Sequence, residues 1–264
     1  MIGKTLVAGI ALTAYQLSGA VPQDQVEAPP RTCESVSAFL DRAEASKEPG
    51  DRERLLGILR TTASRECARV FLGILQAESA RDIQDVAFEV LVALGDERVI
   101  AGIENILRQN PDSAVRRRLA AVIENMLTPS AAHAQYLGQT LLQNPDETLR
   151  ISIPIALGRI GTPESVKQLV SASALLEKKD LPYVVRGFAL IRNEEALVTL
   201  RKLFESSVQG PVREGVAFAL GNYDKPEALA AIESYLKAET SERVREALQV
   251  SWTRISERAI REPK

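Results

Sequence analysis

The amino-acid sequence predicts an all-α protein, a right-handed solenoid of about six helical-hairpin repeats. Two observations lead to this prediction. Hydrophobic residues make up 45% of the 264 residues but aromatic residues only 5%, and the plentiful Ala, Leu, Glu and Arg favour helices over strands. In addition, short motifs recur along the chain at intervals of about 30 to 34 residues, a spacing typical of helical-hairpin repeats.

The first segment, residues 1–20, has the pattern of a secretory signal peptide. Lys4 precedes an apolar run from Thr5 to Leu17, and the small residues Ser18-Gly19-Ala20 follow it. The apolar run is short for a bilayer-spanning helix, and small residues are typical of a cleavage site. We expect cleavage after Ala20 and export to the periplasm or the medium of a bacterium, with no membrane insertion afterwards; an uncleaved anchor is the alternative.

Residues 21–32 are expected to form a flexible linker, because they contain three prolines and almost no large apolar side chains. Residues 33–264 are expected to form the solenoid. Within it, Val36, Phe39, Leu40 and Ala43 share one helical face of the segment 34–47, which is predicted to be an N-terminal cap helix. The segment 241–260 is predicted to be the C-terminal cap.

The repeats between these caps are marked by recurring turn motifs. Asn110-Pro111-Asp112 returns as Asn144-Pro145-Asp146, and Thr128-Pro129-Ser130 returns as Thr162-Pro163-Glu164. Three predicted helices end in the same three residues, which are Ala93-Leu94-Gly95, Ala156-Leu157-Gly158 and Ala219-Leu220-Gly221. Proline suits a first helical turn, Thr an N-cap and Gly a left-handed C-cap. These motifs therefore predict where helices begin and end.

The segments between the turns show helical periodicity. In the segment 97–109, one face carries Val99, Ile100, Ile103, Ile106 and Leu107. In the segment 113–127, one face carries Val115, Leu119, Val122, Ile123 and Met126. Period-two alternation is absent, so each repeat is predicted to contain two amphipathic helices. Pro154 lies inside the predicted helix 147–160 and is expected to kink it.

These motifs resemble the HEAT repeats, in particular the short HEAT-like repeats of phycobilisome lyases. The resemblance covers roughly residues 50–258. It implies a curved stack in which the helices after Asp112 and Asp146 line a concave inner surface. Stability should then come mainly from contacts between neighbouring repeats.

An arginine recurs after an apolar residue in four repeats, as Arg116, Arg150, Arg213 and Arg245. Asp112 and Asp146 stand four residues before the first two, at helix starts, where a carboxylate caps backbone N–H groups. We expect these six residues to form a structural ladder in which an arginine pairs with the aspartate of an adjacent repeat, as the HEAT resemblance also implies. Ligand binding is the alternative role. Arg117 and Arg118 do not recur, and they are the candidate contacts for a partner.

Catalytic and metal-binding motifs are absent from the sequence. It has one histidine and two cysteines, whereas zinc sites need sets of such ligands. His133 is therefore expected to be an ordinary surface or groove residue, and no cofactor is expected. The net charge of −2 argues against nucleic acid as the main partner.

Cys33 and Cys67 are expected to form one disulfide, because an exported protein with an even cysteine count and no metal motif favours pairing. The bond would fasten the cap helix to the solenoid. Two buried thiols are the alternative.

Together these features predict a non-catalytic scaffold in the bacterial cell envelope that binds an unidentified protein on its concave surface. The alternative is a lyase-like enzyme, or an enzyme subunit, that acts on a chromophore or a modified protein. That alternative would need polar groups that converge in one pocket.

Overall fold

The computed structural model describes residues 30, 32–61, 65–77, 79–126, 128–143 and 146–261. Within these residues there are fourteen α-helices, two short 3₁₀ helices and no strand. None of the described helices is long and apolar enough to cross a membrane. The expected signal peptide, residues 1–20, and most of the expected linker lie outside the described residues.

The helices follow one another with short connections, and their bounds agree with the predicted period. In chain order they are α1 (Cys33–Ala45), α2 (Pro49–Thr61), η2 (Arg65–Cys67), α3 (Ala68–Gln76), α4 (Arg81–Leu94), α5 (Glu97–Gln109), α6 (Ser113–Asn125), α7 (Ala131–Gln143), α8 (Glu147–Ile160), α9 (Pro163–Leu175), η3 (Lys178–Asp180), α10 (Leu181–Phe188), α11 (Glu194–Ser206), α12 (Gly210–Leu220), α13 (Pro226–Ala238) and α14 (Glu242–Arg261).

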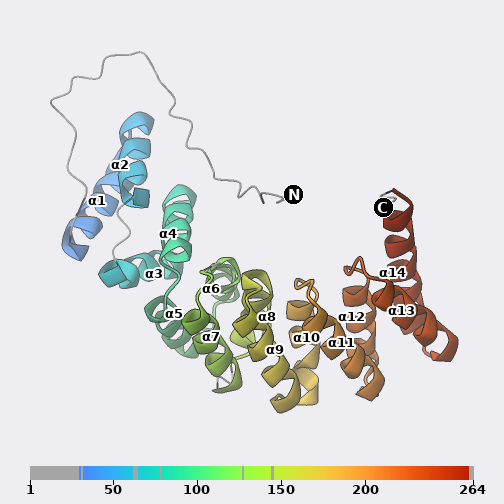
Figure 1. Ribbon diagram of the computed structural model, residues 1–264. Coiled ribbons are helices and arrows are strands. Elements are labelled where there is room, and N and C mark those ends of the chain that lie inside the picture. The colour runs from blue at the N-terminus through green and yellow to red at the C-terminus, as the bar shows by residue number, and fades with distance from the viewer. Residues whose placement is uncertain are drawn as a thin grey trace, which may run out of the picture.

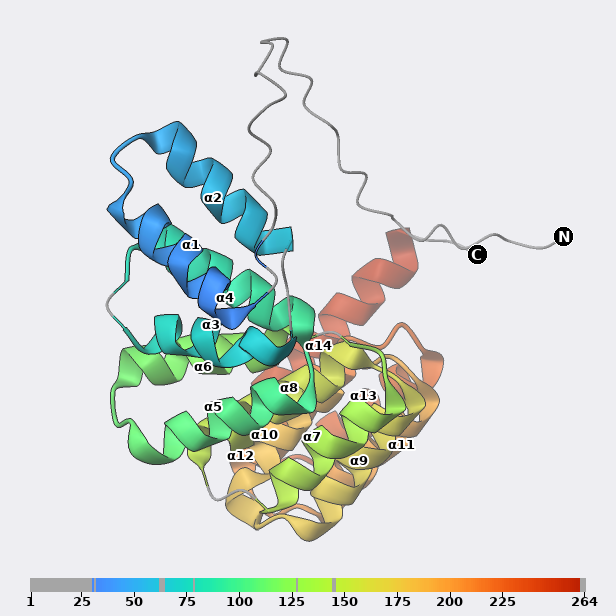
Figure 2. The same ribbon diagram turned by 90° about the vertical axis from the view of Figure 1, so that its left-hand side faces the viewer.

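From α3 onward the helices form two rows that follow one arc (Figure 1). The even-numbered helices lie on the inner side of the arc and the odd-numbered helices on the outer side. Contacts along the inner row join α4 to α6, α6 to α8, α8 to α10, α10 to α12 and α12 to α14. Seen from its N-terminal end, the arc stacks successive hairpins one behind another (Figure 2). The protein is therefore an all-α solenoid, as predicted.

The N-terminal end differs in detail from a single cap helix. The segment predicted as the cap forms α1, and α1 packs against α2 as a hairpin. Counted this way, the described chain holds seven hairpins, from α1–α2 to α13–α14. The sequence did not show the first hairpin as a repeat because it lacks the turn motifs that mark the later ones.

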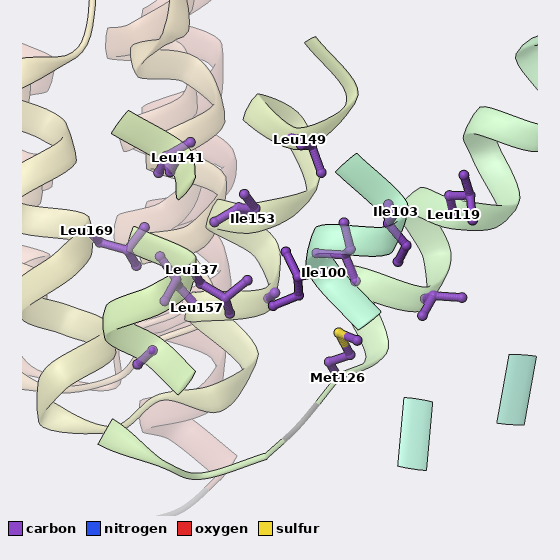
Figure 3. Packing of buried hydrophobic residues seen from close by; sticks show 14 of the residues in the cluster. Ile100, Ile103, Leu119, Met126, Leu137, Leu141, Leu149, Ile153, Leu157 and Leu169 are labelled. Carbon is purple, nitrogen blue, oxygen red and sulfur yellow. The ribbon is translucent and has the colours of Figure 1, made fainter. Parts of the chain in front are cut away.

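The core lies between the two rows and runs the length of the stack. Figure 3 shows side chains of neighbouring hairpins meeting in its middle part, with Leu137 and Leu141 of α7 near Leu157 of α8 and Leu169 of α9. Of the residues predicted for the face of α5, four are buried, whereas Ile106 is only partly buried. All five residues predicted for the face of α6 are fully or almost fully buried.

Most helix ends follow the predicted capping rules. The Thr162 hydroxyl accepts a hydrogen bond from the Ser165 backbone N–H at 3.2 Å, and Pro163 starts α9. Gly95 and Gly161 have φ of 44° and 63°, the left-handed conformation that favours glycine at a helix end. Thr128 differs from the prediction: α7 begins only at Ala131, and the Thr128 hydroxyl donates to the Gly95 carbonyl oxygen at 3.3 Å.

Other glycines are required by close contacts between inner helices. A Cβ atom on Gly158 of α8 would overlap the carbonyl oxygen of Gly187 in α10 and lie 3.0 Å from its carbonyl carbon. A Cβ atom on Gly187 would in turn overlap the carbonyl oxygen of Pro154. Gly221 was predicted as a left-handed cap, but its φ is −62°; a Cβ atom there would lie 2.8 Å from the Ser251 Cβ. These glycines let neighbouring inner helices approach closely.

Candidate functional site

The recurring arginines and acids form ion pairs between neighbouring inner helices. Arg116 of α6 pairs with Asp146 at the start of α8, with 2.5 Å between Nη2 and Oδ2. The same guanidinium donates to the carbonyl oxygens of Leu107 and Asn110 at 2.8 and 3.1 Å. Asp146 also accepts the Thr148 backbone N–H at 2.8 Å and so caps α8. One pair therefore stabilises a turn, a helix start and a repeat junction.

The pattern continues at further junctions with acids that the sequence analysis missed. Arg150 of α8 lies 3.4 Å from Asp180, which precedes α10. Arg213 of α12 pairs with Glu239, which precedes α14. At the N-terminal end, Arg52 of α2 makes two hydrogen bonds of 2.6 and 2.8 Å to Asp82 of α4. Asp82 and Asp180 each lie 30 residues after their arginine, as Asp146 does after Arg116, so this interval could have pointed to both acids.

The electrostatics of the Arg52–Asp82 pair are those of a stable ion pair. The hydrogen bond from Arg52 lowers the pKa of the Asp82 carboxyl below its ordinary value. The same hydrogen bond raises the pKa of the Arg52 guanidinium. Because this pair is partly exposed, its net contribution to stability should be only about 0 to 1 kcal/mol.

Two residues expected in the ladder have other contacts. Asp112 caps α6 by accepting the backbone N–H groups of Ala114 and Val115 at 2.7 and 3.4 Å, and among the described residues no ion pair reaches it. In α4, the inner helix before α6, the position that corresponds to Arg116 carries no arginine, so no ladder arginine is placed to pair with Asp112. Arg245 donates to the Glu239 carbonyl oxygen at 2.8 Å, so it fixes the turn before its own helix.

The two arginines predicted as partner contacts lie on α6, in the inner row, but differ in environment. Arg117 is exposed, and its Nε donates to the Ser113 carbonyl oxygen of its own helix at 3.3 Å. Arg118 is half-buried, and its Nε donates to the Leu75 carbonyl oxygen near the end of α3 at 2.9 Å. Arg118 therefore joins two hairpins, a packing role that the sequence analysis did not include.

His133 does not lie on the surface, one of the two positions expected for it. Its side chain, near the start of α7, is only 4% exposed, and neither ring nitrogen has a hydrogen-bond partner among the described residues. Burial lowers the pKa of the imidazole, and Glu97 and Asp96 raise it by a smaller amount. His133 lines a pocket of about 420 Å³ beside Thr128. Among the described residues no three His, Cys, Asp or Glu side chains gather as metal ligands.

The structure brings the two cysteines together at the N-terminal end. The sulfur atoms of Cys33, at the start of α1, and Cys67, just before α3, face each other, and the Cα atoms of the two residues are 5.0 Å apart. This Cα separation lies within the range of a disulfide.

A pocket of about 560 Å³ lies on the inner side of the arc, between α10, α12 and α14. All of its lining residues come from inner helices or the turns that directly follow them, and none from α9, α11 or α13. Its apolar part is formed by Pro182, Val185, Ala189, Pro211 and Phe218. Phe218 is 41% exposed, which makes it the most exposed phenylalanine among the described residues.

Charged side chains complete this pocket. Arg186, Arg243 and Arg254 line it together with one acid, Glu214. Arg243 pairs with Glu214 at 2.7 Å, and Arg254 donates to the Asn222 side-chain oxygen at 3.1 Å. We call these lining residues the C-terminal inner pocket. The sequence did not predict this pocket, because Arg186, Phe218 and Arg254 recur in no motif and meet only when the hairpins stack.

Comparisons with known proteins agree with the fold. The family model for HEAT repeats matches residues 100–182 and 183–251. No curated protein matches this chain. Similar solved structures include human deoxyhypusine hydroxylase, with 18% identity, 85% of this chain and 97% of that chain covered, and a TM-score of 0.43. The CpcE–CpcF complex of phycocyanin lyase from Nostoc has 16% identity, with 90% and 100% covered and a TM-score of 0.32. A designed armadillo repeat protein in complex with a (KR)4 peptide has 16% identity, with 83% and 99% covered and a TM-score of 0.39.

The two family matches together span more than half of the chain and coincide with the stacked hairpins from α5 to α14. The chain belongs to the HEAT repeat family.

Proposed function

We propose that this protein is a non-catalytic scaffold of the bacterial cell envelope, periplasmic or secreted, that binds a protein partner on its inner surface. Stacked helical repeats present an extended and preformed surface, which suits protein binding. The ion pairs and glycine contacts between inner helices fix the spacing of that surface. Such rigidity lowers the entropy that binding would otherwise cost.

The observation that carries the proposal is the C-terminal inner pocket with its half-exposed Phe218. A large aromatic side chain exposed beside arginines has the composition of a protein-binding hot spot. The pocket spans three repeats, so a ligand that fills it contacts several helices at once.

The placement in the envelope has separate support. The N-terminal segment has the pattern of a signal peptide. The cysteine pair at disulfide distance is compatible with an oxidising compartment. N-terminal sequencing of protein from the envelope fraction should find Val21 first, whereas Met1 would contradict export with cleavage.

The binding role is tested by affinity capture from envelope extract with matched variants. Phe218→Asp on α12 should abolish capture of the partner. Val198→Asp is the control, because Val198 is also 41% exposed but lies on the outer helix α11. Arg117→Glu tests whether the surface extends to α6. Equal capture by the Phe218 and Val198 variants would overturn the proposal.

A further inference from the structure

The C-terminal inner pocket carries more positive charge than its own acids balance. Arg186 lies with its guanidinium carbon 5.9 Å from the centre of the Tyr183 ring, and no carboxylate among the described residues pairs with it. Arg254 is held by the neutral amide of Asn222. Only Arg243 has an acidic partner, Glu214. The pocket therefore has two arginines whose charge is left for a ligand.

This local charge is opposite in sign to that of the whole chain, which has a formal net charge of −2. The ladder arginines of the inner row, such as Arg116, are neutralised by acids of the next repeat. In the pocket, by contrast, Arg186 and Arg254 have no carboxylate partner among the described residues. Charge complementarity selects an anionic ligand, and guanidinium groups bind carboxylates through paired hydrogen bonds.

The pocket also has an apolar part that an inorganic anion would leave unused. Pro182, Val185, Ala189 and Pro211 line it beside the exposed ring of Phe218. A ligand that satisfies both parts needs an apolar side chain flanked by carboxylates. An acidic protein segment with an aromatic residue has this composition.

We infer that the C-terminal inner pocket binds an acidic protein segment, with an aromatic side chain against Phe218 and flanking carboxylates on Arg186 and Arg254. This inference rests on the proposed function and specifies its ligand. Arg243 also lines the pocket, and its ion pair with Glu214 fixes the position of its side chain. Binding should weaken with rising salt, because the exposed charges are screened.

The experiment measures fluorescence anisotropy of labelled synthetic peptides with the whole protein. The first peptide has a central phenylalanine with four glutamates on each side. The second replaces every glutamate by lysine, and the third replaces the phenylalanine by serine. We expect only the first to bind tightly, with at least about tenfold weaker binding of the other two. Equal binding of the lysine peptide, or no binding of the first peptide, would overturn the inference.

Charge-reversal variants locate the binding site. Arg186→Glu should weaken binding of the first peptide by at least about tenfold. Arg98→Glu is the control, because Arg98 is an exposed arginine of the outer helix α5 and its reversal changes the net charge equally. Equal effects of the two variants would mean non-specific attraction and would contradict the pocket as the site. Both variants should melt like the parent protein, since both residues are exposed.

Failure of this inference can be told apart from failure of the proposed function. If the acidic peptide does not bind but Phe218→Asp still abolishes capture of the envelope partner, the inner surface binds a partner of different chemistry. If Phe218→Asp captures the partner as well as Val198→Asp does, the proposed function itself is wrong.

Discussion

The two ends of the solenoid are held together by different means. Near the N-terminus, the polar and covalent contacts that join α1 to α6 are the cysteine pair, the partly exposed ion pair Arg52–Asp82 and the hydrogen bond from Arg118 to α3. Toward the C-terminus, α8 to α14 depend on glycine contacts and on buried acids.

The acids of the ladder show this difference as a gradient along the chain. Their side chains are 45%, 13%, 8% and 1% exposed, in the order Asp82, Asp146, Asp180 and Glu239. One motif thus ranges from a surface ion pair to a buried one. Since a buried carboxylate that loses its partner is costly and an exposed one is not, the same substitution should have very different effects at the two ends.

The largest expected effect is at the buried end of this gradient. Arg213→Met should lower the free energy of unfolding by about 3 to 5 kcal/mol, because the carboxylate of Glu239 would remain buried without its cation. Arg52→Met should lower it by less than about 1 kcal/mol, because Asp82 can be hydrated. Urea denaturation of both variants measures the contrast, and equal losses would refute the gradient.

The next effect concerns the N-terminal cysteine pair. Replacing both Cys33 and Cys67 by serine should destabilise α1 and α2 by about 3 to 4 kcal/mol, through the entropy of the open loop. Because contacts in a solenoid are between neighbours, the C-terminal hairpins should keep their stability.

Limited proteolysis with mass spectrometry should show early cleavage within residues 33–61 of this variant only. Thiol labelling of the unfolded, non-reduced parent protein should find no free cysteine. Two labelled cysteines would show that the pair is reduced in the protein.

A smaller effect is expected at the glycine contact between α8 and α10. Gly158→Ala should cost about 2 kcal/mol, because the added methyl group meets backbone atoms of Gly187 that cannot rotate away. Gly57→Ala in α2 is the control: nothing lies within 4 Å of its Cβ position, so the change should stabilise the helix by about 0.5 to 1 kcal/mol. Thermal melts compare the two, and the same sign for both would contradict the packing argument.

The smallest effect should appear as a pH dependence near the middle of the stack. Burial lowers the pKa of His133 in the folded protein below its ordinary value of 6.5. As the pH falls through 6.5, the unfolded chain therefore takes up a proton before the folded protein does, and stability decreases. His133→Leu should lose less stability between pH 7 and pH 5.5 than the parent protein in urea denaturation. Identical pH profiles would show that His133 contributes nothing to the dependence.

Local rules were sufficient to predict most of the solenoid from the sequence. The face of α6 is buried as its 3.6-residue periodicity predicts, and Gly95 and Gly161 end their helices in the left-handed conformation. Capping and amphipathic burial depend on residues within one helix, so a single sequence contains the information.

The contacts between repeats were harder to predict. Glu239 lies 26 residues after Arg213 rather than 30, and Gly221 is required by Ser251 of a different helix. The inner pocket was missed for the same reason, since Arg186, Phe218 and Arg254 approach one another only when three hairpins stack. The burial of His133 was also missed, because it comes from packing against the neighbouring hairpin and not from the residues next to it in the sequence.

The contact between Gly158 and Gly187 limits how this chain can change, in evolution or in the laboratory. Both partners present backbone atoms, so no substitution elsewhere can make room for a side chain at either position. Hairpins α7–α8 and α9–α10 should therefore be inherited, duplicated or transplanted together. Designers who wish to lengthen the protein should insert new hairpins between α4 and α5, because no ion pair reaches Asp112 among the described residues and α4 and α6 make few contacts; the hydrogen bond from Arg118 to Leu75 would have to be rebuilt.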